Sequence, residues 1–346
     1  MTTTRGPQEP CVGSPTARRI PCYDPELAPL AAQGSVDGHS LRAEDIPRLR
    51  ALTDHWRPRP ETLRRSGRVW PEERTVPGRE GHPDVPVVLL WPTTPYTGPR
   101  PALLACHGGG MVTGTAYSGT PALALWVEEL GVVVFSVGYR LAPEYRHPAA
   151  VEDVMTVWSW MHAHAEDLGL DPARSGVFGV SAGACLAASF SLQARDLRLP
   201  SPRYQILQDA MLDDRHHRPS TFEHMDSGVW DRISSCTAWE SYLGPAVARE
   251  EVSFYAAPGR AADHPEVLRG LPSTFLDVGT EDLFRDDVLA FGAALVGAGV
   301  PTEMHLWAGG WHGFSEMAPH VRLAQDANEA RRRFLARRLA EGSGDV

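Results

Sequence analysis

Short apolar runs recur through the central and C-terminal parts of the chain, separated by longer amphipathic stretches. The runs that predict β-strands lie at 85–91, 102–106, 131–137, 174–180, 204–207, 273–278 and 302–307. The stretches that predict helices lie at 117–130, 148–165, 182–195, 286–298 and 320–339. Positions 132–137 are apolar almost throughout, which is typical of a strand buried on both faces. This alternation predicts an α/β fold with a mostly parallel central sheet flanked by helices.

Three segments break this alternation. Residues 1–20 are rich in Pro, Gly, Thr and Arg, which predicts a disordered leader. Residues 21–66 predict short helices broken by prolines, and 213–263 places several aromatic residues among many polar ones. We interpret the last two segments as N-terminal lid helices and a lid insertion over the carboxyl edge of the sheet. The α/β core then comprises 67–212 and 264–346.

Charge and composition exclude several chemistries. The chain has 346 residues and a formal net charge of −10, and all 33 basic residues are arginine. Without lysine there is no Schiff base, no lysine-bound pyridoxal phosphate and no phosphate-binding G-K-[ST] loop. An acidic chain without a basic block is also a poor ligand for nucleic acid, because phosphate contacts need clustered positive charge.

The distribution of apolar residues and cysteines bears on localisation. No apolar run approaches the ~18 residues of a membrane helix, and the N-terminus lacks the apolar core of a signal peptide. The five cysteines are scattered and include no C-x-x-C pair. These features predict a cytoplasmic protein without a membrane span.

The segment G-V-S-A-G contains the first candidate for catalysis, Ser181. It follows a predicted strand and precedes a predicted helix. In such a strand-to-helix turn the serine Oγ is exposed, and glycines on either side prevent clashes. The helix N-terminus directs partial positive charge to the same point. The pattern indicates a serine nucleophile.

A glycine-rich loop, H-G-G-G, directly follows the predicted strand that ends at residue 106. Consecutive glycines allow backbone N–H groups to approach a ligand oxygen, as an oxyanion hole requires. We assign the donors to the amides of Gly109, Gly110 and Ala182, and include Gly108 as the residue that shapes the loop. His107 is interpreted as an anchor of the loop.

An acid and a histidine each follow a later strand, at the edge of the sheet where Ser181 is expected. Asp282 comes after the strand at 273–278, and His312 comes after the strand at 302–307. The chain order of serine, acid and histidine is that of α/β-hydrolases. His312 would accept the Ser181 proton, while Asp282 would fix the tautomer of the imidazole.

Other acids and another histidine lie close by in the sequence. The competing acids are Glu281, Asp286 and Asp287, of which the last two fit the first turn of a helix. The competing histidine, His305, lies within a predicted strand and is expected on a sheet face or in the core.

The motifs H-G-G-G, Y-R-L-A-P-E, G-x-S-A-G, D-L-F-R-D and H-G-F, in this order, resemble those of the hormone-sensitive-lipase-like family of α/β-hydrolases. The resemblance extends over about residues 80–340. It implies the α/β-hydrolase fold, an esterase that needs neither a metal nor an organic cofactor, and a lid built from two segments. It also implies a nucleophile at Ser181, an acid at Asp282 and a base at His312, with oxyanion donors at Gly109, Gly110 and Ala182.

The chain departs from the family pattern at several positions near the expected site. Val180 stands where the family often has Asp, Met111 where an aromatic residue is usual, and Ala184 where glycine is common. Residues 208–210, Gln-Asp-Ala, replace an apolar-Tyr-Pro step. None of these positions belongs to the triad, and together they indicate a reshaped acyl pocket.

The predicted function is hydrolysis of a carboxylic ester through an acyl-enzyme. An acyltransferase, lactonase or cyclising enzyme on the same triad is an alternative, and a non-catalytic small-molecule receptor on the same scaffold is a second. The partner is a small ester or acyl substrate, and a homodimer is a possible assembly because related enzymes are often dimers. The acyl chain, the alcohol and the natural acceptor are not encoded in any motif.

Overall fold

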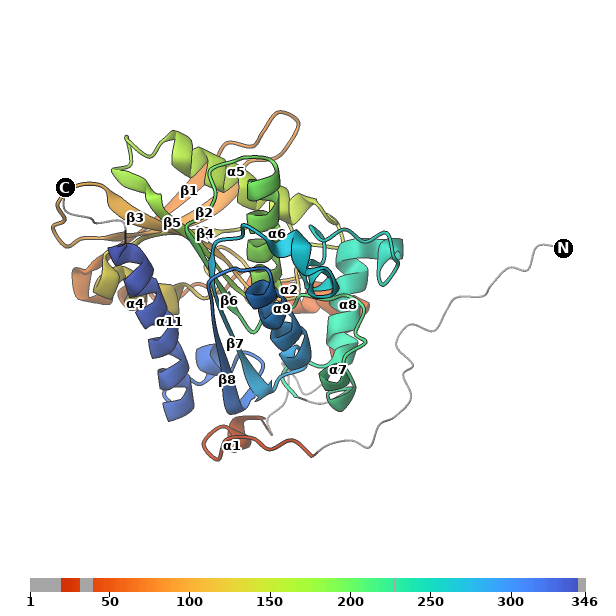
Figure 1. The fold of residues 1–346 in the computed structure, drawn as a ribbon. Helices are drawn as coiled ribbons and strands as arrows, with labels where there is room; N and C mark the ends of the chain where they lie inside the picture. Colours follow the sequence, from red (N-terminus) through yellow and green to blue (C-terminus); the bar gives the residue numbers. More distant parts are fainter. Residues whose placement is uncertain (1–19, 32–39, 227, 342–346) are drawn as a thin grey trace.

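A sheet of eight strands crosses the part of the chain that the structure describes, a computed structural model covering residues 20–31, 40–226 and 228–341 (Figure 1). The strands are β1 (Val69–Val76), β2 (Val85–Pro92), β3 (Arg100–Cys106), β4 (Val133–Val137), β5 (Leu170–Val180), β6 (Tyr204–Gln208), β7 (Ser273–Glu281) and β8 (Thr302–Trp311). Their spatial order is β1-β2-β4-β3-β5-β6-β7-β8. Pairs β1–β2 and β2–β4 are antiparallel, and the other pairs are parallel. The predicted α/β-hydrolase fold with a mostly parallel sheet is confirmed.

Helices cover both faces of this sheet. α4 (Thr120–Leu130) and α11 (Arg322–Ala340) lie on one face, while α5 (Ala149–Ala163), α6 (Ala182–Asp196) and α9 (Arg285–Gly297) lie on the other (Figure 1). Each face has its own cluster of buried apolar side chains. All five residues of β4 are buried, as expected for a central strand covered on both sides.

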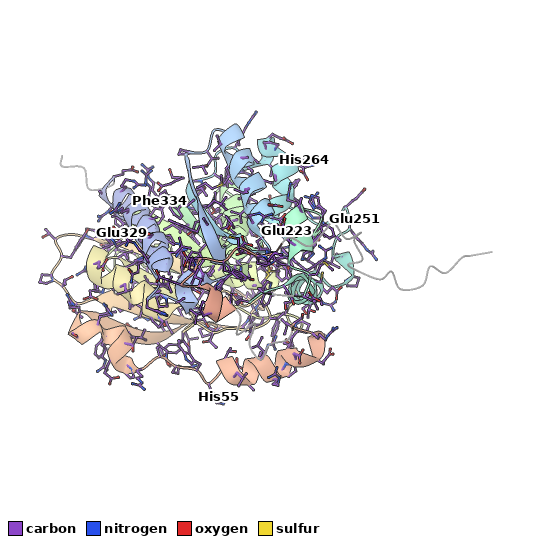
Figure 2. The ribbon with its side chains drawn as sticks, turned by 90° about the horizontal axis from the view of Figure 1, so that it is seen from below. His55, Glu223, Glu251, His264, Glu329 and Phe334 are labelled. Carbon is purple, nitrogen blue, oxygen red and sulfur yellow. The ribbon has the colours of Figure 1, made fainter. Side chains whose placement is uncertain are left out.

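The C-terminal helix α11 illustrates how the pattern of the sequence produces this layering. Phe334 packs on the ring of Phe275 in β7, with ring centroids 5.4 Å apart. Glu329, which Figure 2 labels on the same helix, forms ion pairs with Arg332 and Arg333 instead. An apolar stripe at helical spacing therefore meets the sheet, while the ion-paired residues Glu329, Arg332 and Arg333 lie on the side away from it.

Short helical elements lie outside the main layers. They are α1 (Ala28–Ala31), η2 (Ala43–Asp45), α2 (Ile46–Thr53), α3 (Pro60–Arg64), η3 (Arg65–Gly67), α7 (Pro219–Glu223), α8 (Arg232–Leu243), η4 (Gly244–Ala246), η5 (Pro258–Asp263), η6 (Pro265–Leu268) and α10 (Phe314–Met317). The N-terminal segment contacts α8 through Leu41, whose N–H donates to Ser234 Oγ at 2.8 Å and whose carbonyl accepts from Thr237 Oγ1 at 2.9 Å. The two segments that interrupt the alternation thus touch each other.

The structure also departs from the sequence predictions. Strand β1 was not predicted, because its buried residues Val69 and Val76 stand only at its two ends, with Pro71 and charged residues between them. Strands β7 and β8 extend to Glu281 and Trp311, beyond the predicted ends at 278 and 307. As a result, Asp282 and His312 directly follow their strands.

Among the short helices predicted within 21–66, η2 and α2 together span 43–53 in the structure. Of their apolar residues, Leu49 packs against the core while Leu52 is 56% exposed. The predicted leader at 1–20 lies outside the described residues except for its last position. Among the described residues, no helix combines the length and apolar character needed to cross a bilayer.

Candidate active site

Ser181 lies at a sharp turn between β5 and α6, with a backbone φ of +54° that non-glycine residues seldom adopt. Glycines make this turn possible. A Cβ on Gly179 would lie 2.2 Å from the carbonyl oxygen of Gly183, and a Cβ on Gly183 would lie 2.1 Å from that of Cys106. The G-x-S-x-G pattern therefore reflects close backbone packing, which fixes the serine at the carboxyl edge of the sheet.

The loops after β7 and β8 bring an acid and a histidine to this serine. Nε2 of His312 lies 3.0 Å from Ser181 Oγ, and its Nδ1 lies 2.8 Å from Asp282 Oδ2. The other oxygen of Asp282 accepts from the Phe284 N–H at 2.8 Å. Asp282 is fully buried, and Ser181 is 5% exposed. The three side chains form a hydrogen-bonded line from residues far apart in the sequence.

The electrostatics of this line stabilise the cationic form of the His312 imidazole relative to a free histidine. Burial lowers the pKa of His312, but the charge and hydrogen bond of Asp282 outweigh burial, and the pKa lies above its usual value. An imidazole that is stabilised as a cation is suited to take up a proton from Ser181 Oγ.

The glycine loop lies beside the serine. A Cβ on Gly108 would be 3.5 Å from Ser181 Cβ, while Gly109 and Gly110 adopt φ of +107° and +61°. Within the described part of the chain, the amides of Gly109, Gly110 and Ala182 donate no hydrogen bond to another residue. They are left available to a ligand oxygen near Ser181.

His107 is separate from the hydrogen-bonded line. Its ring stacks on Tyr139 with centroids 4.1 Å apart, and its Nδ1 lies 2.7 Å from the carbonyl oxygen of Gly108. The Tyr139 hydroxyl donates to the His107 carbonyl at 2.8 Å. Burial lowers the pKa of His107 to about 4, so the ring is neutral at pH 7. These contacts agree with the predicted anchoring of the loop.

The competing residues point elsewhere. Asp286 accepts from the Ser220 N–H, and Asp287 pairs with Arg218. Glu281 is buried at the end of β7, with Oε1 3.2 Å from Thr280 Oγ1. His305 lies on β8 between the rings of Phe275 and Trp307.

Asp209, in the loop after β6, was noted only as a departure from the family pattern, and no role was predicted for it. Its Oδ2 accepts from the Gly313 N–H at 3.2 Å, directly after His312, while its Oδ1 is buried without a hydrogen-bond partner. Burial, and then the charge of Asp282, raise the pKa of Asp209 to about 8. A second carboxyl group therefore lies behind the histidine, protonated at neutral pH.

A buried ion pair between α11 and β7 lies next to this region. Arg331 of α11 is 1% exposed and binds both oxygens of Asp277 in β7, at 2.9 and 3.1 Å from its Nε. Its Nη2 also donates to Ser315 Oγ, which accepts from Gln208 Nε2 as well. This network joins α11, β6, β7 and the segment after His312. No local sequence motif predicts this network.

The insertion contributes an aromatic wall. The Trp230 ring lies 6.3 Å from the His312 ring, centroid to centroid. A Cβ on Gly110 would lie 2.9 Å from Trp230 and 3.0 Å from Ala238 Cβ in α8.

Within the described residues, no group of three or more His, Cys, Asp or Glu side chains converges as a metal site would.

Comparisons with known proteins agree with this architecture. A family described as alpha/beta hydrolase fold matches residues 103–316. Esterase LipI of Mycobacterium tuberculosis is 31% identical over 269 residues, which is 73% of this chain and 82% of that protein. Ethyl acetate hydrolase of Pseudomonas putida is 30% identical over 252 residues, or 72% and 76% of the two chains.

Solved structures give the same picture. A bacterial heroin esterase superposes with a TM-score of 0.82 at 34% identity, covering 92% of this chain and 98% of that one. Esterase LipW from Mycobacterium marinum superposes with a TM-score of 0.81 at 32% identity, covering 91% and 96%.

Proposed function

The chain belongs to the hormone-sensitive-lipase-like family of α/β-hydrolases and is a carboxylic ester hydrolase, and we propose that Ser181, His312 and Asp282 form its catalytic triad. The observation that carries this proposal is the hydrogen-bonded line from Ser181 Oγ through His312 to Asp282, with spacings of 3.0 and 2.8 Å. Such spacing lets the imidazole act on the serine hydroxyl as a general base.

The first half-reaction forms an acyl-enzyme. His312 Nε2 takes the proton of Ser181 Oγ as this oxygen attacks the ester carbonyl carbon. The resulting oxyanion is held by the amides of Gly109, Gly110 and Ala182, in a loop shaped by Gly108. The tetrahedral intermediate then breaks its bond to the alcohol oxygen, and this oxygen receives the proton from His312.

The second half-reaction returns the enzyme to its starting state. A water molecule gives its proton to His312 Nε2 and attacks the acyl carbon, and Ser181 Oγ leaves with the proton that His312 returns. Asp282 stays ionised and stabilises the imidazolium during both steps. Water is the proposed acceptor, so the products are a carboxylic acid and an alcohol.

We infer that the segments 21–66 and 213–263 form a lid that shapes the substrate site. The proximity of Trp230 and Ala238 to Gly110 supports this role for the insertion. The hydrogen bond between Thr53 Oγ1 and Thr113 Oγ1, at 2.8 Å, supports it for the N-terminal segment. Thr113 follows the glycine loop closely in the chain.

The test is the hydrolysis of p-nitrophenyl butyrate by Ser181→Ala. We expect kcat to fall by on the order of 10⁶, because the serine and histidine of a triad act as a unit. Ser201→Ala, which removes an exposed serine outside both lid segments, is the control and should match the wild type. Full activity of Ser181→Ala would overturn the mechanism.

The acceptor is tested by product analysis in the presence of a primary amine or an added alcohol. We expect the free acid as the main product. Predominant transfer of the acyl group to the added nucleophile would favour an acyltransferase instead.

A further inference from the structure

The glycine loop beside Ser181 is closed by residues that follow it in the chain. The carbonyl oxygen of Gly109 accepts from the N–H groups of Val112 and Thr113, each at 3.1 Å. A Cβ on Gly109 would lie 2.4 Å from the Thr113 carbonyl oxygen, so the two backbones pack directly on each other. The backbone over 109–113 therefore forms a tight turn.

This turn sets the direction of a proposed oxyanion donor. The carbonyl of Gly109 and the N–H of Gly110 belong to one planar trans peptide unit, so they point in opposite directions. Because Val112 and Thr113 bind the carbonyl on one side, the N–H is directed to the other side. A displacement that broke these two hydrogen bonds would allow the peptide unit to rotate and turn its N–H away from a ligand oxygen.

A single guanidinium connects this turn to the N-terminal segment. Arg50 of α2 donates from Nε to the carbonyl oxygen of Val112 at 2.7 Å, and from Nη2 to that of Ala142 at 2.5 Å. The Ala142 N–H in turn donates to the carbonyl oxygen of Met111 at 2.9 Å. Arg50 thus holds the turn directly through Val112 and indirectly through Ala142.

A second side chain of α2 contacts the same turn. Thr53 Oγ1 lies 2.8 Å from Thr113 Oγ1, at hydrogen-bond distance. Arg50 and Thr53 are three residues apart in α2, so their side chains lie on one face of the helix. The helix therefore binds both residues, Val112 and Thr113, whose N–H groups fix the Gly109 carbonyl.

The bonds to carbonyl oxygens matter more here than the charge of Arg50. Its planar guanidinium presents several donors at fixed angles, which allows one side chain to bind two carbonyl groups. The Arg50 side chain is 19% exposed, whereas its ion-pair partner at 2.9 Å, Glu144, is 57% exposed. Because an exposed ion pair contributes little, the carbonyl bonds account for the connection between α2 and the turn.

We propose that Arg50, assisted by Thr53, is a positioning residue for the oxyanion hole and acts by fixing the direction of the Gly110 N–H. The proposal rests on the function proposed above. It gives the N-terminal segment a part in the chemical step, in addition to the covering of the substrate site.

The experiment measures hydrolysis of p-nitrophenyl butyrate by Arg50→Met, which removes the guanidinium but keeps a long side chain. We expect kcat to fall by about 10- to 100-fold, because a misdirected donor costs less than the roughly 10²- to 10³-fold lost with a whole donor. KM should change by less than about threefold, because the negative charge on the carbonyl oxygen develops only in the transition state.

Two ketone inhibitors separate positioning from a general loss of structure. Heptan-2-one resembles the ester before attack. With 1,1,1-trifluoroheptan-2-one, Ser181 Oγ adds to the carbonyl carbon, its proton passes to His312, and the carbonyl oxygen becomes an oxyanion. In Arg50→Met, the affinity for the trifluoromethyl ketone should fall by the same factor as kcat/KM, while the affinity for heptan-2-one should stay within about twofold.

Further variants identify which contact is responsible. Glu144→Gln removes the ion pair but leaves the carbonyl bonds, and its kcat should stay within about threefold of the wild type. Thr53→Val removes only a hydroxyl, and should lower kcat by about two- to fivefold. Arg50→Lys keeps the charge without the planar set of donors, and should recover only part of the loss. Arg333→Met, on the exposed side of α11, is the matched control and should be fully active.

An unchanged kcat in Arg50→Met would overturn the proposal. Equal losses of affinity for the two ketones would also overturn it, because they would indicate a general role in substrate binding. Failure of the proposed function is a different result, namely undiminished hydrolysis by Ser181→Ala. Thermal unfolding identifies variants that do not fold, and if Arg50→Met is one of them, the two ketone affinities of Arg50→Lys and Thr53→Val decide by the same criterion.

Discussion

The loops after β6 and β7 both begin with a buried aspartate close to His312, yet the surroundings of the two residues differ. Asp282 uses both oxygens, one toward His312 Nδ1 and one for the Phe284 N–H. Asp209 has one oxygen without a hydrogen-bond partner, and its other accepts from the Gly313 N–H. Two carboxyl groups at the same edge of the sheet thus have unequal means of stabilising a negative charge.

This difference teaches that hydrogen bonds, more than proximity, decide which acid is charged. A buried carboxylate is stable only where donors or a cation replace its lost hydration. Asp282 has such partners, whereas burial and the Asp282 charge raise the pKa of Asp209 to about 8. We therefore assign the support of the imidazolium to Asp282 and a neutral positioning role to Asp209.

The largest effect is expected when the charged member of the pair is neutralised. Asp282→Asn should lower kcat/KM by on the order of 10⁴, because the amide cannot hold the imidazole in the same tautomer or stabilise its cation. The measurement is steady-state hydrolysis of p-nitrophenyl butyrate at pH 7. Equal losses in Asp282→Asn and Asp209→Asn would remove the distinction between the two loops.

The next effect concerns stability and a third buried carboxylate, Asp277 on β7. Its charge is compensated by Arg331, so Arg331→Met should cost about 3–5 kcal/mol in the free energy of unfolding by leaving this charge unpaired. Urea denaturation measures the loss. Arg333→Met, which breaks an exposed pair with Glu329, serves as the control and should cost at most about 1 kcal/mol.

The double variant Arg331→Met/Asp277→Leu sharpens this result, since it removes both charges together. It should recover part of the lost stability. A double variant no more stable than Arg331→Met would show that packing, and not the unpaired charge, accounts for the cost.

The smallest effect is expected for Asp209→Asn, which preserves an acceptor for the Gly313 N–H. The change in kcat/KM at pH 7 should stay within about tenfold, the equivalent of one hydrogen bond. The wild-type pH profile should contain an inflection near pH 8 that this variant lacks, because Asp209 then loses its proton beside His312. An unchanged inflection in the variant would contradict the assignment.

The substitution Asp209→Asn should also change how the free energy of unfolding depends on pH. The folded-state pKa of Asp209 lies above its unfolded value of about 4, so the native state binds the extra proton between pH 4 and 8. The stability that this group contributes is complete below about pH 4 and declines as the pH rises toward 8. Relative to the wild type, Asp209→Asn should therefore gain in free energy of unfolding as the pH is raised over this range.

The sequence predicted those parts of the site that local geometry determines. Ser181 and the glycine loop follow predicted strands, and the carboxyl ends of parallel strands meet at one edge, so the approach of Asp282 and His312 also follows from the alternation. Their catalytic roles remain predictions. The structure adds the distances between them.

Other residues were missed because their partners are far away in the sequence and their types are ordinary. Arg331 reads as one of many arginines on a charged helix, yet it pairs with Asp277 in the core. Strand β1 was hidden because an edge strand needs few apolar residues.

The most direct test of the central claim is covalent labelling with a fluorophosphonate, followed by mass spectrometry of the intact protein and its peptides. The account predicts one label per chain, located on Ser181, with loss of esterase activity in proportion to labelling. Ser181→Ala should take up no label, and Ser201→Ala should be labelled like the wild type. Stoichiometric labelling at another residue, or full esterase activity in a completely labelled enzyme, would contradict the account.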